Sequence, residues 1–305
     1  MNNVMIGTWA WGSGNNGSKM VFGNKTDSEK LAETFNKAYE SGFLNWDTAA
    51  VYGMGTCETF LGSLIKDKKD IYISTKYFPS KKYKKGGLTE SFNESCERLQ
   101  REVIDLFWIH VPNNLTSNLE ELAELVKAGK VLNIGISNVS LDHIKEAMEF
   151  LKKYDLKVNA VQNHFSLLRN DQGKIIDYCH EIGIDYYAYM VLEQGALSGH
   201  YSAKNHFPTF SMRGFAFPKS KFKKIESLLS KMKELADKYD VDSSQIPILW
   251  AIGRGTIPIV GLTKPTHAEK LFKASEINLT KEEMDMLEKE ASLTGIRQKG
   301  MWEPQ

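Results

Sequence analysis

Four ionisable side chains of different chemistry follow short apolar segments in the first half of the 305-residue chain. Asp47 and Tyr52 lie in the segment Trp-Asp-Thr-Ala-Ala-Val-Tyr-Gly, residues 46–53. Lys76 ends the run Ile-Tyr-Ile-Ser-Thr-Lys, and His110 ends Asp-Leu-Phe-Trp-Ile-His. In a barrel of parallel strands, the carboxyl ends of the strands meet on one face, where active sites are built. The spacing therefore predicts that a carboxylate, a phenol, an amine and an imidazole share one site.

These four groups suit the transfer of a proton to an oxygen atom. A free phenol has a pKa of roughly 10, and a nearby ammonium group favours the phenolate and lowers that pKa. A buried lysine needs a counter-charge, so Asp47, Lys76 and Tyr52 can form a tuned acid. Neutral His110 can donate an N–H to a substrate oxygen and polarise a carbonyl group. Because no side chain donates hydride, reduction of that carbonyl requires a nicotinamide cofactor.

Composition excludes several other classes of protein. The formal net charge is +1, so no global field favours nucleic acid or an anionic membrane. The cysteines Cys57, Cys96 and Cys179 are widely spaced without a C-x-x-C, which predicts neither a disulfide framework nor a zinc site. No apolar run reaches the ~18 residues of a membrane helix, and no signal peptide is visible. We expect a cytoplasmic location and no metal centre.

The elements that must position these groups alternate along the chain. Short apolar, β-branched or aromatic segments are separated by longer segments of helical period, which predicts βα units and a parallel sheet. Eight such units predict closure into a barrel. The predicted strands are residues 4–9, 43–47, 71–76, 104–109, 131–136, 157–162, 184–189 and 256–260.

Capping sequences mark where three of the helices begin. Thr26-Asp27-Ser28-Glu29 and Ser117-Asn118-Leu119-Glu120 both match the capping box, and Ser140 can cap a third helix. Residues 190–220 follow no regular period.

A minimal barrel has one helix for each strand, whereas this chain has more. Two helices are additional, one before the eighth strand and one C-terminal. The expected fold is therefore a single (β/α)8 TIM barrel domain over residues 1–305, with these two additions. The predicted helices near the eighth strand are 221–239, 243–253, 265–274 and 280–291.

The first loop contains a dinucleotide-binding pattern that we interpret as accidental. Gly12-Ser13-Gly14-Asn15-Asn16-Gly17 matches G-x-G-x-x-G after a strand. That fingerprint needs its third glycine in the first turn of a helix, so that the helix N-terminus faces the pyrophosphate. The next predicted helix begins near residue 27, about ten residues later than the fingerprint requires. We therefore expect a loop without this function.

A series of motifs in the expected order resembles the aldo-keto reductase family over nearly the whole chain, most closely its bacterial type. The motifs are Gly-Thr-Trp-Ala-Trp-Gly (7–12), Asp-Thr-Ala-x-x-Tyr-Gly (47–53), Ser-Thr-Lys (74–76), Ile-His-x-Pro (109–112), Gly-Lys-Val-x-x-Ile-Gly-Ile-Ser-Asn (129–138), Val-Gln-Asn-x-Phe-Ser-Leu (161–167) and Ile-Pro-Ile-Val-Gly-x-Thr-Lys-Pro (257–265). The resemblance implies a (β/α)8 barrel with two extra helices. It also implies a catalytic tetrad of Asp47, Tyr52, Lys76 and His110, with Tyr52 as general acid.

By the same resemblance, NADPH lies extended across the barrel mouth, and an aldehyde or ketone is reduced to an alcohol. The resemblance implies that the nicotinamide carboxamide is held by Ser137, Asn138 and Gln162, and that the nicotinamide ring stacks on Tyr189. It also implies that the rest of the cofactor, including its 2′-phosphate, is bound by Leu192, Gly261, Thr263 and Lys264. The substrate pocket is expected to include Trp9, Phe78 and either Trp108 or Val111, with parts of 190–220.

The chain departs from the family pattern at the adenosine end. The usual Tyr-Ser-Pro-Leu is Tyr-Met-Val-Leu at 189–192, so a serine contact to the diphosphate is lost. Leu271 replaces an asparagine that contacts adenine, and His267 replaces a glutamine or arginine.

Two other functions are compatible with the same fold. One is a nucleotide-binding regulatory subunit, like potassium-channel β subunits. The other is a Schiff-base aldolase in which Lys76 is the nucleophile. The residues that match the cofactor site argue against the aldolase, and fold alone does not decide. The expected partner is a small carbonyl substrate, without nucleic acid or membrane.

Overall fold

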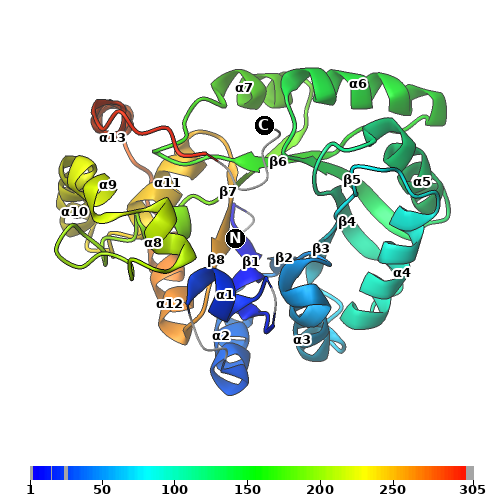
Figure 1. Ribbon diagram of the computed structural model, residues 1–305, viewed down its shortest axis with the longest axis horizontal. Helices are drawn as coiled ribbons and strands as arrows, with labels where there is room; N and C mark the ends of the chain where they lie inside the picture. The colour runs from blue at the N-terminus through cyan, green and yellow to red at the C-terminus, as the bar shows by residue number, and fades with distance from the viewer. Residues whose placement is uncertain (1–2, 15, 24–26, 300–305) are drawn as a thin grey trace.

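Eight parallel strands form a closed barrel in the computed structural model, which describes residues 3–14, 16–23 and 27–299. Each strand pairs with its neighbours in sequence order, and β8 pairs with β1 to close the sheet (Figure 1). The predicted (β/α)8 barrel is confirmed. The strands are β1 (Met5–Gly7), β2 (Asn45–Asp47), β3 (Tyr72–Tyr77), β4 (Ile104–Ile109), β5 (Val131–Ser137), β6 (Ala160–His164), β7 (Asp185–Tyr189) and β8 (Ile257–Gly261).

Helices surround the barrel and connect its strands (Figure 1). The connecting helices are α2 (Ser28–Glu40), α3 (Thr56–Ile65), α4 (Gly87–Leu99), α5 (Leu115–Lys127), α6 (Leu141–Leu151), α7 (Gly173–Glu181) and α11 (Gln245–Gly253), and α12 (Pro265–Ala274) follows the last strand. Short helices in the loops are α1 (Ser18–Phe22), α8 (Met212–Ala216) and α9 (Lys219–Lys224). The two additions to the minimal barrel are α10 (Glu226–Tyr239) and α13 (Lys281–Leu293), which pack against each other.

The register of the strands brings polar residues to one end of the barrel. Asp47, the last residue of β2, lies opposite Gly7 of β1 and Ser74 of β3. At the corresponding ends of the later strands, Ser137 lies opposite Gln162. Parallel strands start and finish on the same faces of a barrel, so these side chains converge although they are far apart in sequence.

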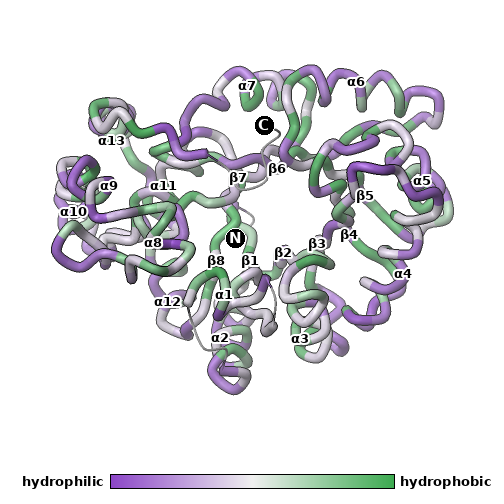
Figure 2. The backbone as a smooth tube through the Cα atoms, viewed as in Figure 1, coloured by the Kyte–Doolittle hydropathy of each residue, from purple (hydrophilic) through white to green (hydrophobic). Residues whose placement is uncertain are grey.

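The apolar core has two parts, one between the barrel and its helices and one inside the barrel. In Figure 2, β1 and β8 are mostly hydrophobic, and the helices alternate between hydrophilic and hydrophobic residues along their length. Met5, Leu106, Trp108 and Tyr187 fill the barrel interior. The Trp108 ring meets the Tyr187 ring edge to face, with centroids 5.4 Å apart. Trp108 is therefore a core residue, and its assignment to a substrate pocket is wrong.

Several predicted boundaries need correction. The first strand is shorter than 4–9, and the sixth begins at Ala160 rather than at residue 157. The predicted helix 221–239 is two helices, because Ile225 departs from helical geometry with φ −96° and ψ 6°. Ile225 lies between α9 and α10, where the chain changes direction, and its side chain stays buried in the core.

Of the predicted helix caps, one is confirmed, one is shifted by a residue and one is wrong. Ser140 caps α6 as expected, in a capping box that His143 completes. Asp27 caps α2 by accepting a hydrogen bond from the Lys30 amide, while Thr26 lies outside the described residues. Ser117 caps nothing, since α5 already begins at Leu115. Periodicity alone cannot distinguish a serine at a helix start from one in the first turn.

The glycine-rich first loop also differs from its prediction. A helix does begin directly after Gly17, but α1 has only five residues. The Ser18 amide donates to the Gly12 carbonyl at 2.8 Å, which folds the loop back on itself. Asn15 of the motif lies outside the described residues. Since the sheet is a closed barrel rather than an open doubly wound sheet, the loop is not part of a Rossmann fold.

Within the described residues, no helix combines the length and apolar character needed to cross a bilayer.

The barrel interior provides a test of close packing. A side chain at Gly135 in β5 would overlap the Trp108 indole, which lies against this glycine in the barrel. Gly135→Ala is expected to lower the free energy of unfolding by about 2 kcal/mol, the usual cost of overpacking a core. Urea unfolding followed by circular dichroism measures this change. Gly173→Ala is the matched control, because an added Cβ there comes no closer than 3.7 Å to a neighbour. Equal stability of the two variants would contradict this account of the interior.

Candidate active site

The four groups singled out from the sequence lie together at the carboxyl ends of neighbouring strands. Asp47 ends β2, Lys76 is the penultimate residue of β3, and His110 follows β4. Tyr52 opens a short 3-10 helix, Tyr52–Gly55, in the loop after β2. All four side chains are buried, and the Lys76 side chain is fully inaccessible to solvent.

A buried ion pair between Asp47 and Lys76 is the centre of this cluster. The Lys76 ammonium also donates to the Thr48 carbonyl at 2.7 Å. On the other side of the pair, the Ser74 hydroxyl donates to Asp47 Oδ1 at 2.6 Å, and Gln162 Nε2 lies 3.5 Å from the same oxygen. The charges are therefore compensated inside the barrel, as a buried ion pair requires.

Tyr52 lies between this pair and the first loop. Lys76 Nζ is 5.0 Å from the centroid of the Tyr52 ring, and the Trp9 ring stacks on the other side at 5.6 Å. Burial, and secondarily the charge of Asp47, raises the pKa of Tyr52 well above its usual value of 10. The expected lowering of this pKa by Lys76 is therefore not found. The phenol keeps its proton at neutral pH, as a proton donor must.

The other two groups are also shifted by burial. Burial lowers the pKa of Lys76 from 10.5, and the neighbouring Asp47 opposes that shift. Burial, together with the charge of Lys76, lowers the pKa of His110 well below 6.5. The imidazole is therefore neutral at pH 7, as the sequence argument required. The rings of Tyr52 and Phe78 both pack edge-on against it, at 5.9 and 5.3 Å.

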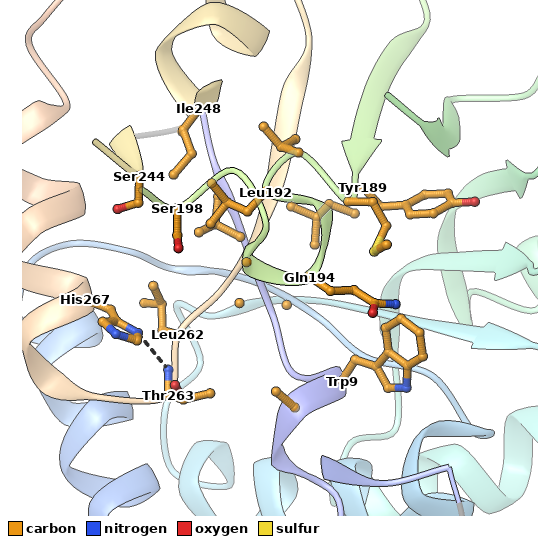
Figure 3. Close-up of a pocket in the computed structure, with 18 of the residues that line it drawn as sticks. Trp9, Tyr189, Leu192, Gln194, Ser198, Ser244, Ile248, Leu262, Thr263 and His267 are labelled. Atoms are coloured by element: carbon orange, nitrogen blue, oxygen red, sulfur yellow. Dashed lines mark hydrogen bonds between the residues drawn. The ribbon is translucent and has the colours of Figure 1, made fainter. Parts of the chain in front are cut away.

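A cavity of about 690 Å³ opens above the cluster, and Asp47, Tyr52 and His110 line it. It extends from the barrel mouth past the loop after β7 to the start of α12. Figure 3 shows Trp9, Tyr189 and Gln194 at one side of this cavity, and Ser244, Thr263 and His267 at the other. The shape is therefore elongated, with the ionisable cluster near one end.

The residues expected to hold a carboxamide form one hydrogen-bonded group. Asn138, in a left-handed conformation with φ 59°, donates through Nδ2 to the His110 carbonyl at 2.8 Å. The Tyr189 hydroxyl donates to Asn138 Oδ1 at 2.5 Å. Asn138, Gln162 and Tyr189 line the cavity. Ser137 is fully buried outside the lining, where its hydroxyl donates to the Gln162 carbonyl at 2.8 Å.

The other end of the cavity contains the residues expected at the adenosine end. Leu192, Gly261, Thr263 and Lys264 line it, as do His267 and Leu271. The Thr263 amide donates to His267 Nδ1 at 3.3 Å (Figure 3). Burial, with Lys264 and Lys270 nearby, lowers the pKa of His267 to about 4. His267 is thus neutral at pH 7, so Lys264 supplies a positive charge that His267 does not.

The expected substrate-pocket residues are only partly brought together. Trp9 lines the cavity, and the Phe22 ring, which also lines it, meets Trp9 edge-on at 5.3 Å. The lining includes neither Phe78 nor Val111. Phe78 instead supports His110 from outside the lining, and Val111 is buried.

Arg213 is a cavity residue that sequence reasoning missed. It belongs to α8, and its guanidinium lies 4.6 Å from the centroid of the Phe207 ring. Arg213 Nη1 donates to the Gln194 carbonyl at 3.4 Å. The irregular stretch 190–220 offers no periodicity from which its direction could be predicted.

Over the described residues, no three His, Cys, Asp or Glu side chains are grouped as metal ligands.

Comparison with known proteins gives this arrangement a family. The model of the Aldo/keto reductase family matches residues 3–291. The chain belongs to this family. Aldo/keto reductases are oxidoreductases that use NADPH.

Known proteins of similar sequence or structure match most of the chain. The chloroplastic pyridoxal reductase of Arabidopsis thaliana is 29% identical, with 93% of this chain and 81% of that protein covered. An aldo-keto reductase of Schizosaccharomyces pombe, named for NADP(+), is 26% identical, with 89% and 85% covered. The crystallised glycerol dehydrogenase of Gluconobacter oxydans has a TM-score of 0.81 at 23% identity, covering 95% of this chain and 91% of its own. At that identity the likeness to the glycerol dehydrogenase shows the fold alone.

The neutral state of His110 leads to a prediction about stability and pH. The unfolded chain binds a proton at this residue below about pH 6.5, whereas the folded protein does not. Unfolding is therefore favoured as the pH falls below 6.5, with a slope of up to about 1.4 kcal/mol per pH unit for one proton. His110→Gln should remove this contribution. Urea titrations between pH 4.5 and 8 measure the slope.

His267 serves as the comparison, because its pKa of about 4 places its own contribution between pH 4 and 6.5. His267→Gln should leave the part of the slope that belongs to His110. An unchanged slope in His110→Gln would show that this imidazole takes up a proton as readily in the folded protein as in the unfolded chain, which would contradict the lowered pKa.

Proposed function

We propose that this protein is an NADPH-dependent carbonyl reductase that converts an aldehyde or ketone to an alcohol. The observation that carries the proposal is the meeting of Tyr52, neutral His110 and the Asp47–Lys76 ion pair at the base of one cavity. An acid that keeps its proton and a neutral imidazole beside it suit the protonation of a carbonyl oxygen.

NADPH, when bound, supplies the hydride that reduces the carbonyl carbon. Tyr52 gives its hydroxyl proton to the carbonyl oxygen, and the product is the alcohol. His110 donates a hydrogen bond to that oxygen and orients it. Lys76, 5.0 Å from the centroid of the Tyr52 ring, stabilises the phenolate that remains, and Asp47 keeps the ammonium charged and fixed in place. The proton of Tyr52 is then restored from solvent.

The residues at the cavity wall fit such a cofactor. The amides of Asn138 and Gln162 can donate to and accept from a carboxamide, which has both kinds of group. Tyr189 offers a ring face for the nicotinamide, and Ser137 supports Gln162 from behind. Leu192 and Gly261, which also line the cavity, would contact the rest of the cofactor, and we assign Thr263 and Lys264 to its 2′-phosphate.

The aldolase alternative is disfavoured by the environment of Lys76. A Schiff-base lysine attacks a substrate carbonyl with its free amine. Here the Lys76 nitrogen is fully buried, paired with Asp47 and bonded to the Thr48 carbonyl. The lining of the cavity includes Asp47 but not Lys76.

A nucleotide-binding regulatory subunit on the same fold is the other alternative, and turnover distinguishes it. Aldehydes, ketones and sugars should be screened by the loss of NADPH absorbance, with pyridoxal included because the Arabidopsis relative is named for it. Tight binding of NADPH without turnover of any carbonyl compound would favour the regulatory function.

Removal of the proton donor tests the assigned chemistry directly. Tyr52→Phe is expected to lower kcat at least ~100-fold, the usual effect of losing a general acid. The affinity for NADPH, measured by quenching of tryptophan fluorescence, should change little. Tyr186→Phe is the matched control, since this buried tyrosine does not line the cavity. Near-normal turnover by Tyr52→Phe on a substrate whose chemical step limits the rate would refute the assignment.

Cofactor preference tests the other end of the cavity. A charge-assisted bond from Lys264 to the 2′-phosphate should contribute ~1.5–3 kcal/mol, so NADPH should bind at least about tenfold more tightly than NADH. Lys264→Ala should remove most of that difference by weakening NADPH alone. Lys273→Ala, on the same helix but paired with Asp240 away from the cavity, should leave both affinities unchanged. Equal dissociation constants for the two cofactors in the unmutated protein would contradict this reading.

A further inference from the structure

A buried cluster of Glu193, His164 and Ser166 lies beside the cavity but is not part of its lining. Glu193 Oε1 is 2.7 Å from His164 Nε2, and it accepts a hydrogen bond from the Ser166 hydroxyl. Glu193 and Ser166 are fully inaccessible to solvent, and His164 is 2% exposed. A carboxylate at such a depth is costly, so this cluster needs an explanation.

The left-handed backbone conformation at Glu193 adds to the free-energy cost of burying its carboxylate. Glu193 has φ 48° and Gln194 has φ 54°, in the left-handed region that side chains with a Cβ disfavour. Glycine would adopt this conformation more readily, and Gly195 does so with φ 98°. In addition, Glu193 Oε2 and His164 Nδ1 are buried without a hydrogen-bond partner in the described structure. Stability alone therefore does not favour a glutamate here.

The cluster connects directly to the residues that face the cofactor. The His164 ring stacks on the Tyr189 ring, with centroids 5.5 Å apart and an interplanar angle of 27°. Tyr189 donates to Asn138, and Asn138 donates to the carbonyl of His110. His164 and Tyr189 are also opposite each other in the register of β6 and β7. The Tyr189 ring is thus supported by His164 at its face and by Asn138 at its hydroxyl.

Glu193 is also the residue that leads into the cavity wall. Its amide donates to the Met190 carbonyl at 2.8 Å, and its carbonyl accepts from the Ala196 amide at 3.0 Å. The next two residues, Gln194 and Gly195, line the cavity. One buried side chain therefore ties the turn 190–196 to the end of β6.

We propose that Glu193, acting through His164, is a positioning residue for the nicotinamide end of the cofactor. Its carboxylate fixes the plane of the His164 ring, and this ring in turn fixes the Tyr189 ring on which the nicotinamide stacks. The turn that carries Gln194 is fixed by the same bond. This inference rests on the proposed function, because it needs NADPH in the cavity. Neither Glu193 nor His164 lines the cavity, so neither is assigned a proton-transfer step.

The experiment compares Glu193→Ala with Glu193→Gln. The alanine variant leaves His164 and Ser166 without their shared acceptor, so kcat should fall about tenfold or more and the dissociation constant of NADPH should rise several-fold. The glutamine variant retains an oxygen that can accept both bonds, so it should keep at least about a third of the unmutated kcat. Bound NADPH should also show altered nicotinamide fluorescence in the alanine variant alone.

Two controls separate positioning from loss of stability. Glu283→Gln and Glu283→Ala change another buried carboxylate, which binds Lys238 and Tyr239 outside the lining of the cavity. They should lower the melting temperature and leave kcat and cofactor affinity unchanged. Ser166→Ala removes a single hydroxyl from the cluster, and a two- to fivefold loss in kcat is expected even if Glu193→Ala fails to fold.

The outcomes distinguish this inference from the proposed function. If the unmutated protein does not bind NADPH, the proposed function fails. If it binds NADPH and turns over a carbonyl substrate, while the Glu193 and Ser166 variants change only the melting temperature, the proposed function stands and the positioning role is overturned. An equal loss in Glu193→Gln and Glu193→Ala would also overturn it, because charge and not hydrogen-bond geometry would then be responsible.

Discussion

The ion pair between Asp47 and Lys76 is the interaction on which the rest of the site depends. Two opposite charges lie inside the barrel, and each is accompanied by further polar contacts from Ser74 and from the Thr48 carbonyl. Removing either charge would leave the other buried and uncompensated, which is far more costly than losing a surface ion pair. The pair thereby holds the ends of β2 and β3 in register with the groups around them. The buried phenol and the neutral imidazole take their properties from the same low-dielectric surroundings.

Closure of the sheet explains how a site of such distant residues can be rigid. The strands are short, and each is paired on both sides, so the position of a strand-end side chain is fixed by its neighbours rather than by its own loop. The ionisable cluster comes from β2, β3 and β4 and the segments that follow them, whereas the loops after β7 and β8 supply much of the cavity wall. The cluster and much of the wall thus belong to different elements. The family can therefore vary the loops, and with them the substrates, without disturbing the ionisable cluster.

The inferred role of Glu193 is to hold one of these loops, the loop after β7, against the barrel. A residue in a loop is usually held less firmly than one in a strand. Here the loop after β7 is anchored by a buried carboxylate that bonds to the end of β6, so the wall of the cavity acquires some of the rigidity of the barrel. The hydrogen bonds of the buried Glu193 carboxylate offset the unfavourable backbone conformation at Glu193 and Gln194.

The sequence by itself determined the order of elements and the identity of the reactive groups. Apolar runs of the right length predict eight strands, and a residue such as Lys76 or His110 at the end of such a run is visible without any structure. The boundaries were less certain, because Ile225 continues a helical pattern while its backbone does not. Ser117 illustrates the same limit, since a residue type that often caps helices also occurs inside the first turn.

Only the tertiary structure decided how these residues act on one another. The sequence argument expected Lys76 to lower the pKa of Tyr52, but burial and Asp47 raise it, and burial is a property of the folded chain as a whole. The resemblance implied either Trp108 or Val111 as a pocket residue, yet the alternation of side chains along β4 directs Trp108 into the barrel. Arg213 and the Glu193–His164 contact join segments that share no pattern, so only the fold reveals them. Local sequence specifies which groups are present, whereas dielectric surroundings and long-range contacts arise from packing.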